Sequence, residues 1–464
     1  MLNLINIRAR NPVSSCAWWL CCWLLGTSVL PGCTNAVLRP TFPNDVPAQN
    51  VKPFSQYTGD TGGKADKEQK PIVVKTFLVH GMTYSDSRWA DTFIQNFSRR
   101  VGVDVPPCSS DHQIDIAGSP WAEGPAHLCV VSGHRGTVEY KFYALQWSPL
   151  TVPYKCTEPM QRDRDAKSPI LSADKPGPAG EAGRLCDKTF PSFATRRAVI
   201  NGTIKNSVLD DGFPDVIVYL APDFQPVFWR VVSEGLCRMY SDDPRTDRCA
   251  LPEDAKTNCG ADVPMPSQSQ RYVFVTHSLG ANILLDTLAD SLKCVKEAKS
   301  GFESKLGAAI QATFVGPTPF YMLANQYVLL QLHKASETDF PHRWPSTERV
   351  VPSTFDIRMH PFFKALTTSP RVQSRGAKTR QAELQVDIVA FSDPNDDLTF
   401  LLPSELPVSN GISVQNVLVR GAPEYLFFLE DPLSAHVNYF RKPQQTQVLD
   451  VIFCGMDQNG VLPC

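Results

Sequence analysis

Short apolar segments recur along most of this chain, and they restrict its possible folds more than any other feature. The first, Ile72–Val79, is rich in β-branched residues and ends at a His-Gly pair. Runs of this length between turn residues are typical of strands buried on both faces of a parallel sheet. The sequence predicts such strands at 72–79, 140–147, 215–221, 272–275, 308–315, 384–391 and 414–419.

Helical patterns lie between several of these runs. Apolar residues at helical spacing predict helices over 89–101, 224–239 and 282–295. The alternation predicts an α/β fold with a mostly parallel central sheet flanked by helices. A composition of 42% hydrophobic and 20% charged residues fits a packed globular core. The formal net charge of -2 gives no reason to expect a nucleic-acid partner.

The N-terminus has the features of an export signal. Arg8 and Arg10 precede an apolar run over 17–30, so residues 1–32 are predicted to be a signal peptide. The sequence Leu-Pro-Gly-Cys at 30–33 resembles a bacterial lipobox. That resemblance implies that Cys33 is lipidated and anchors the protein to a membrane, in the periplasm or at the outer membrane. Cleavage followed by secretion is the alternative.

The rest of the chain is expected to form one domain with two insertions. Residues 33–70 are polar and contain many prolines and glycines, so we expect a flexible tether there. The folded domain is predicted over 71–464. Its apolar rhythm is interrupted at about 150–192 and 237–268, which we interpret as cap or loop segments inserted at one edge of the sheet. The alternative is that they only decorate the surface.

The cysteines agree with export. Of the 14 cysteines, four lie at or before position 33, which leaves ten in the remaining chain. An even number in an exported chain predicts disulfides, and the absence of a C-x-x-C pair argues against zinc. The pairing stays open, although neighbours such as Cys108 with Cys129, or Cys156 with Cys186, would close short loops.

The motif Thr-His-Ser-Leu-Gly at 276–280 carries the chemistry. It follows the strand predicted at 272–275 and precedes a helix, which is the setting of a nucleophile elbow with Ser278 as the nucleophile. Gly280 and Ala281 are small enough to let strand and helix approach closely. The usual G-x-S-x-G pattern has glycine where this chain has Thr276, and a side chain of that size can fit.

A serine needs a base and an acid that orients the base. In this type of site the chain order is serine, acid, histidine. Only His436 follows the late strand 384–391 and its aspartate-rich turn, so it is predicted to be the base. Asp396 is predicted to be the acid, and Asp393 is the alternative. The remaining turn aspartates would stabilise the turn.

The fourth expected element is an oxyanion hole, which stabilises negative charge on the carbonyl oxygen. One donor should be the backbone N–H of Leu279, directly after the serine. The other should come from the loop after 72–79, where Met82 is the best candidate because Gly81 leaves room for the substrate. His80 is expected to be structural.

Together these motifs resemble the α/β-hydrolase superfamily of lipases and esterases, from about residue 70 to the C-terminus. The resemblance implies an α/β-hydrolase fold, and hydrolysis of a small-molecule or lipid carboxylic ester through an acyl-enzyme on Ser278. His436 would act as general base and then as general acid. No metal and no organic cofactor are implied. Two alternatives stay open: an acyltransferase that uses the same triad, and a membrane-anchored binding module without activity.

Overall fold

The computed structural model of the chain describes part of its 464 residues. The described residues are 39–43, 50–59, 71–82, 85, 88–116, 125–157, 209–210, 212–250, 263–297, 305–335, 353–368, 384–403, 411–420, 424–425, 429–430, 432–440 and 444–464. The chain divides into Met1–Arg39 and Pro40–Cys464, and the architecture below is that of the second unit. The predicted signal peptide and Cys33 lie outside the described residues. Within the described part of the chain, no helix has the length and apolarity needed to span a bilayer.

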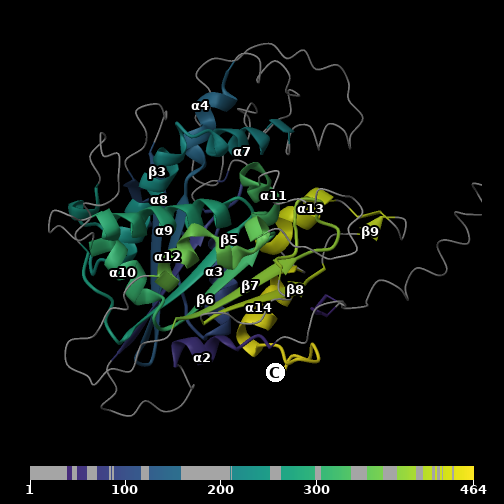
Figure 1. Cartoon of the computed structure of the whole chain (residues 1–464). Helices are drawn as coiled ribbons and strands as arrows, with labels where there is room; N and C mark the ends of the chain where they lie inside the picture. Colours follow the sequence, from purple (N-terminus) through teal and green to yellow (C-terminus); the bar gives the residue numbers. More distant parts are fainter. Residues whose placement is uncertain are drawn as a thin grey trace, which may run out of the picture. The chain divides into compact units, whose positions relative to one another are not determined.

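Eight strands form the central sheet (Figure 1). They are β1 (Ile72–Val79), β2 (Gln113–Ile116), β3 (Ala126–Arg135), β4 (Val138–Gln146), β5 (Gln270–His277), β6 (Pro317–Leu323), β7 (Gln385–Ser392) and β8 (Ile412–Leu418). Their order across the sheet is β2-β3-β4-β1-β5-β6-β7-β8. From β4 to β8 all neighbours are parallel, whereas β2 and β3 add an antiparallel margin. The predicted α/β class with a mostly parallel sheet is therefore confirmed.

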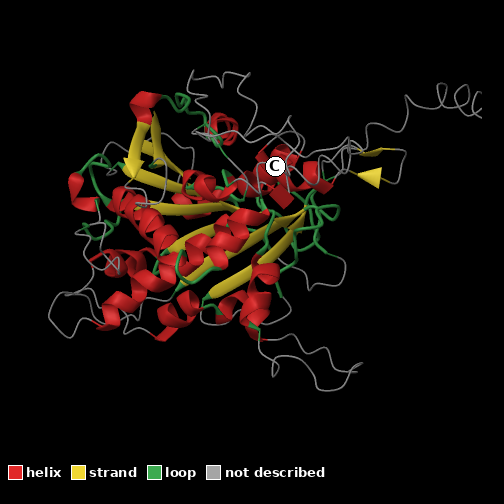
Figure 2. Cartoon of the chain, turned by 90° about the horizontal axis from the view of Figure 1, so that it is seen from above, coloured by secondary structure: helices red, strands yellow, loops and turns green. Residues whose placement is uncertain are grey.

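Helices pack against both faces of this sheet (Figure 2). They are α2 (Phe54–Thr58), α3 (Asp91–Arg100), α4 (Val152–Lys155), α7 (Phe213–Leu220), α8 (Gln225–Tyr240), α9 (Gly280–Glu297), α10 (Lys305–Thr313), α11 (Tyr327–Gln331), α12 (Pro361–Thr368), α13 (Pro432–Val437) and α14 (Gln444–Cys454). A separate two-stranded ribbon pairs β9 (Glu424–Tyr425) with β10 (Leu429–Glu430).

Alternate residues of each central strand contribute side chains to two apolar cores, one on each face of the sheet. On β1, Phe77 and Val79 contribute to the core under α8, α9, α10 and α12. Val74 and Leu78 point to the other face, where α3 and α14 pack. A strand that is apolar at successive positions can fill both cores, because side chains alternate between the faces of a sheet. This explains why continuous apolar runs predicted the strands β1, β4, β5, β7 and β8.

Two predicted strands are wrong. The run 215–221 belongs to helix α7, which begins at Gly212-Phe213-Pro214 and buries Asp215, Val218 and Tyr219 on one face. Proline in the first turn favours a helix start, and this signal outweighed the β-branched composition. The run 308–315 lies mostly in α10, whose sequence Lys-Leu-Gly-Ala-Ala-Ile-Gln-Ala-Thr is rich in alanine, the best helix former.

Three strands of the central sheet were not predicted from the sequence, β2, β3 and β6, and of these β6 lies in the middle of the sheet. It contains Pro317 and Pro319, and proline normally argues against a central strand because it donates no backbone hydrogen bond. Its pairing with β7 begins at Pro317, but its pairing with β5 begins only at Phe320, beyond both prolines. The strand therefore loses little of its hydrogen-bonded ladder.

The predicted tether over 33–70 is wrong for its described part. Thr41 forms a β-bridge with Leu418 at the end of β8, and Val51 forms another with Met456. Between these bridges and β1, helix α2 buries Phe54 and Tyr57. The segment is folded because its few apolar side chains join the core on the α14 face. It also covers part of β8, the edge strand of the sheet.

The two predicted insertions are described only in part. In the first, the chain forms a 3-10 helix, η2 (Ser148–Thr151), and then α4, and residues 158–208 lie outside the described residues. The second prediction begins too early, because α8 continues to Tyr240. The structure describes its residues 241–250 and 263–268 but not 251–262.

Disulfides close short loops, as predicted. The described pairs are Cys108–Cys129, Cys237–Cys249 and Cys454–Cys464. Cys156 is also disulfide-bonded, while Cys186 lies outside the described residues. These bonds fit the interpretation that the cysteines restrain loops.

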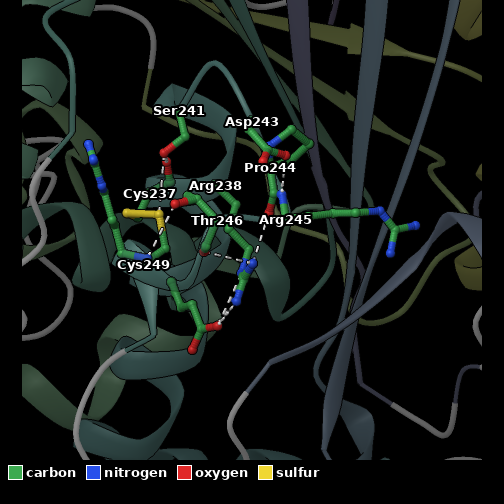
Figure 3. The surroundings of a disulfide bond; sticks show 10 residues. Cys237, Arg238, Ser241, Asp243, Pro244, Arg245, Thr246 and Cys249 are labelled. Atoms are coloured by element: carbon green, nitrogen blue, oxygen red, sulfur yellow. Dashed lines mark hydrogen bonds and ion pairs between the residues drawn. A yellow bond between two sulfur atoms is a disulfide. The ribbon is translucent and has the colours of Figure 1, made fainter.

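The Cys237–Cys249 bond fixes the loop that leaves α8 (Figure 3). Arg238 lies at its centre: its guanidinium pairs with Glu234 one turn earlier and donates a hydrogen bond to the carbonyl of Pro244, at 2.8 Å. Arg245 extends away and donates to the carbonyl of Asp111, just before β2. The loop is thus joined to the antiparallel margin of the sheet.

Candidate active site

The serine occupies a strained turn between β5 and α9. Ser278 has a φ of 52°, one of two positive values among the described non-glycine residues. Such a backbone conformation is costly for a side-chain-bearing residue and persists only where the surrounding structure imposes it. Here the Ser278 N–H donates to the carbonyl of Leu323 on β6, at 2.9 Å. Thr276 fits at the position usually held by glycine, and it is completely buried.

Two glycines allow the turn to lie against the loop after β1. A Cβ on Gly280 would stand 2.4 Å from the carbonyl oxygen of His80, a backbone atom. A Cβ on Gly81 would stand 2.5 Å from the Ser278 Cβ. Both distances are well below van der Waals contact, so any larger residue would push the loop and the elbow apart. Gly280 was expected to let the strand and helix of the elbow approach each other, and the close contact found at Gly280 is with the loop after β1.

Three predicted residues, far apart in the sequence, come together at the carboxyl ends of the strands. The Nε2 of His436, on α13, lies 2.9 Å from the Oγ of Ser278. Its Nδ1 lies 2.9 Å from both carboxylate oxygens of Asp396. A carboxylate can only accept, so Nδ1 carries the proton and Nε2 is left to accept the serine proton. All three residues are buried.

The two aspartates that competed in the sequence have different surroundings. Asp396 faces His436, whereas Asp393 accepts hydrogen bonds from the backbone N–H of Asn395 and from the side chain of Gln444, on α14. Asp393 therefore stabilises the turn and fixes the turn to a neighbouring helix. The geometry brings together the predicted acid, Asp396, and not its alternative.

Two further residues fix the acid loop and were not identified from the sequence. The hydroxyl of Thr399 donates a hydrogen bond to Oδ2 of Asp396. Asn325 binds Phe400 twice, through its backbone carbonyl at 3.0 Å and its side-chain amide at 3.0 Å. A single sequence gives no signal for Asn325, because the contact depends on β6, which was itself missed. Thr399 could have been found as a polar residue three positions after the acid.

The proposed oxyanion donors lie on the two segments that meet at Ser278. Leu279 follows the serine directly, and Met82 follows Gly81, whose backbone abuts the serine. Among the described turns, loops and caps, no backbone carbonyl accepts a hydrogen bond from the N–H of Leu279 or of Met82. Their role as oxyanion donors remains a prediction.

His80 holds the loop after β1 to the end of β4. Its Nε2 accepts hydrogen bonds from the backbone N–H of Trp147, at 3.1 Å, and of Ser148, at 3.3 Å. Its Nδ1 donates to the carbonyl of Gly81, and its ring stacks on the Trp147 indole at 4.6 Å. Burial lowers the pKa of His80 to about 3, which keeps the ring neutral. Both ring nitrogens are used, which accords with the structural role expected for it.

His277, the residue before the serine, is a second buried neutral histidine. Its Nε2 donates to the backbone carbonyl of His436, at 2.9 Å. Burial, together with the nearby His436 ring, lowers the pKa of His277 to about 3. Its place within the motif at 276–280 did not indicate this contact.

The described residues contain no cluster of three or more His, Cys, Asp or Glu side chains arranged to hold a metal ion. A comparison of the chain with protein-family models, with curated proteins and with solved structures gives no match.

Proposed function

We propose that this protein is a serine hydrolase that cleaves a carboxylic ester, with an α/β-hydrolase fold and an acyl-enzyme on Ser278. The observation that carries the proposal is the position of the His436 ring, with Nε2 at 2.9 Å from the serine oxygen and Nδ1 on Asp396. This is the arrangement that a general base needs: within hydrogen-bond distance of the proton, and oriented by a third group.

The reaction follows from these contacts. His436 Nε2 takes the proton of Ser278 as the serine Oγ attacks the carbonyl carbon of the ester. Asp396 stabilises the imidazolium that results, and the N–H groups of Leu279 and Met82 stabilise the oxyanion. The imidazolium then gives its proton to the alkoxide leaving group, which departs as an alcohol. Water, deprotonated by His436, attacks the acyl-enzyme and releases the acid.

The location of the protein is part of the proposal. The disulfides support an oxidising compartment, since such bonds persist in exported proteins and are rare in the cytosol. With the lipobox-like sequence at 30–33, this supports export and an anchor at Cys33. A small-molecule or lipid ester is the proposed substrate. The positioned base favours an enzyme over a binding module without activity.

A fluorophosphonate probe tests the activity directly. We expect the purified wild-type protein to be labelled on Ser278, and Ser278→Ala to remain unlabelled. p-Nitrophenyl esters of graded acyl length would then identify the preferred substrate. A matched control is Ser291→Ala, which removes a buried serine on α9 that bonds the carbonyl of Thr287. If folded wild-type protein is not labelled while a known serine esterase is, the proposal is wrong. Diversion of the acyl group to added alcohols would identify an acyltransferase.

A further inference from the structure

The His277 ring lies between the loop after β1 and the segment that carries the base. On one side, a Cβ added to Gly81 would stand 2.7 Å from the His277 Nδ1, so the ring touches the loop after β1. On the other side, Nε2 lies 2.9 Å from the His436 carbonyl. The ring centroids of His436 and Phe440 lie 5.3 Å and 5.2 Å from the ring centroid of His277.

The proton on this ring can be assigned from its partner. A carbonyl oxygen only accepts, so the Nε2 of His277 must be the donor. Its pKa of about 3 means that the ring carries a single proton near neutral pH, and Nδ1 is then unprotonated. The nitrogen that lies 2.9 Å from the Ser278 Oγ is Nε2 of His436, whereas Nε2 of His277 binds the His436 carbonyl.

The carbonyl that it binds lies near the end of a short helix. His436 is the penultimate residue of α13, and the last carbonyls of a helix have no partner within the helix. The backbone at His436 is therefore held by contacts outside the helix. The ring nitrogens of His436 depend on that backbone for their position, and small displacements of a reacting group can cost large factors in rate.

We infer that His277 is a positioning residue: it binds the His436 carbonyl and so holds the imidazole within hydrogen-bond distance of Ser278. The inference rests on the proposed function, since it concerns the same site. It predicts that the hydrogen-bond donor at this position, rather than the bulk of the ring, determines the rate at which Ser278 reacts.

Three substitutions separate the donor from the bulk. His277→Gln keeps an N–H at nearly the same distance from Cα, His277→Asn places the same amide one carbon shorter, and His277→Leu removes the donor. His360→Leu is the matched control, because His360 is also buried and hydrogen-bonded, but to Asp286 on α9 and not to the triad. Each protein is first tested for folding by thermal unfolding.

The measurements are the second-order rate of fluorophosphonate labelling, and kcat and KM with a p-nitrophenyl ester. We expect His277→Leu and His277→Asn to lower the labelling rate and kcat about tenfold or more, and to change KM less than twofold. The reason is that each variant loses the one hydrogen bond that aligns the base. His277→Gln should restore the rate to within about threefold of wild type. His360→Leu should lose stability but keep its labelling rate.

Three results would overturn the inference. They are wild-type reactivity of folded His277→Leu, equal rates for the glutamine and asparagine variants, and a rise in KM with kcat unchanged. If His277→Leu does not fold, the comparison of glutamine with asparagine decides alone.

A second measurement does not depend on activity. The His436 Nδ1–H, bonded to Asp396, should give a downfield proton NMR signal in wild type and His277→Gln, and a faster-exchanging signal in His277→Asn. An identical signal in all three overturns the inference even if no variant is labelled. Absence of labelling in wild type would count only against the proposed function.

Discussion

Among the described residues, two buried histidines pair with an aspartate, and of the two only His436 also lies at a serine hydroxyl. His436 pairs with Asp396 at 2.9 Å, and His360 pairs with Asp286 at 3.0 Å. The second ring nitrogen of His436 lies at Ser278, whereas that of His360 accepts the backbone N–H of Phe362. A buried histidine paired with an aspartate is therefore not sufficient to form a general base. What matters is whether the remaining nitrogen is free to accept a proton from a nucleophile.

The carboxylates differ in the same way. Besides His436, Asp396 accepts hydrogen bonds only from described residues of its own loop, Leu398 and Thr399. Asp286 instead accepts hydrogen bonds from Tyr219 and from Lys334, at 3.2 Å, which lie on other segments. Burial raises the pKa of the Asp286 carboxyl, but the hydrogen bond and charge of His360 and the charge of Lys334 outweigh it and hold the pKa below its usual range. Asp286 thus joins α7 and the segment around η5 (Leu332–Lys334) to α9, and its role is in stability.

The largest expected effect is on the base. His436→Gln should lower kcat for ester hydrolysis about 10⁴-fold or more, because no group remains to take the serine proton. His360→Gln should change kcat less than about threefold. Steady-state kinetics with one p-nitrophenyl ester would check both. Similar losses in the two variants would show that the two pairs are not distinct in function.

The acid should show the next effect. Asp396→Asn should lower kcat about 10³-fold or more, since an amide favours the wrong tautomer of His436. Asp393→Asn should retain most activity, because Asp393 contacts Asn395 and Gln444 and not the base. Greater loss in the Asp393 variant would reverse the assignment of the acid.

The structural pair should affect folding and not the reaction. Asp286→Ala leaves His360 and Lys334 without their partner, and we expect a loss of about 3 kcal/mol in the free energy of unfolding. Denaturation in urea would measure it. The labelling rate of the folded protein should stay within about threefold of wild type. A stable Asp286→Ala protein would contradict the structural role.

The smallest expected effect is on how the free energy of unfolding depends on pH. It distinguishes the buried neutral histidines, His80 and His277, from the histidines that pair with an aspartate. His80 and His277 have pKa values of about 3 in the folded protein, against 6.5 for the free side chain. Below pH 6.5 the unfolded chain takes up protons that the folded protein does not. Each residue should therefore reduce the free energy of unfolding by about 1 kcal/mol per pH unit as the pH falls from 6.5 towards 3.

Denaturation at pH 7 and pH 5 would show this loss, and His277→Gln, which has no titrating ring, should lose less. Equal losses in the two proteins would mean that His277 is not kept neutral in the folded protein.

Much of the site could be predicted from the sequence, because its residues follow strands. The apolar run before Ser278 and the late run before Asp396 are central strands buried on both faces, and such strands carry the clearest sequence signal. The order of serine, acid and histidine then selected His436. The roles of His277 and Asn325 could not be predicted, since each depends on a contact between separate segments, whereas Thr399 contacts Asp396 within one loop.

The errors in the fold have a common physical origin. A short apolar run does not distinguish a buried strand from a buried helix, and 215–221 and 308–315 became helices through local signals, proline in the first turn and alanine content. The strand β6 was missed because its prolines contradict a central strand, yet its neighbours pair mainly beyond them.

The bridges of Thr41 with Leu418 and of Val51 with Met456 have a consequence for folding. They join residues separated by nearly the whole length of the chain, so this N-terminal segment cannot reach its final position until the last strand and helix have been synthesised. Contacts of this range are slow to form because loop closure must precede them. His436 also comes from that last stretch. Closure of the edge strand and arrival of the base therefore belong to the same late stage, and a truncated chain would carry the strained serine without the residue that activates it.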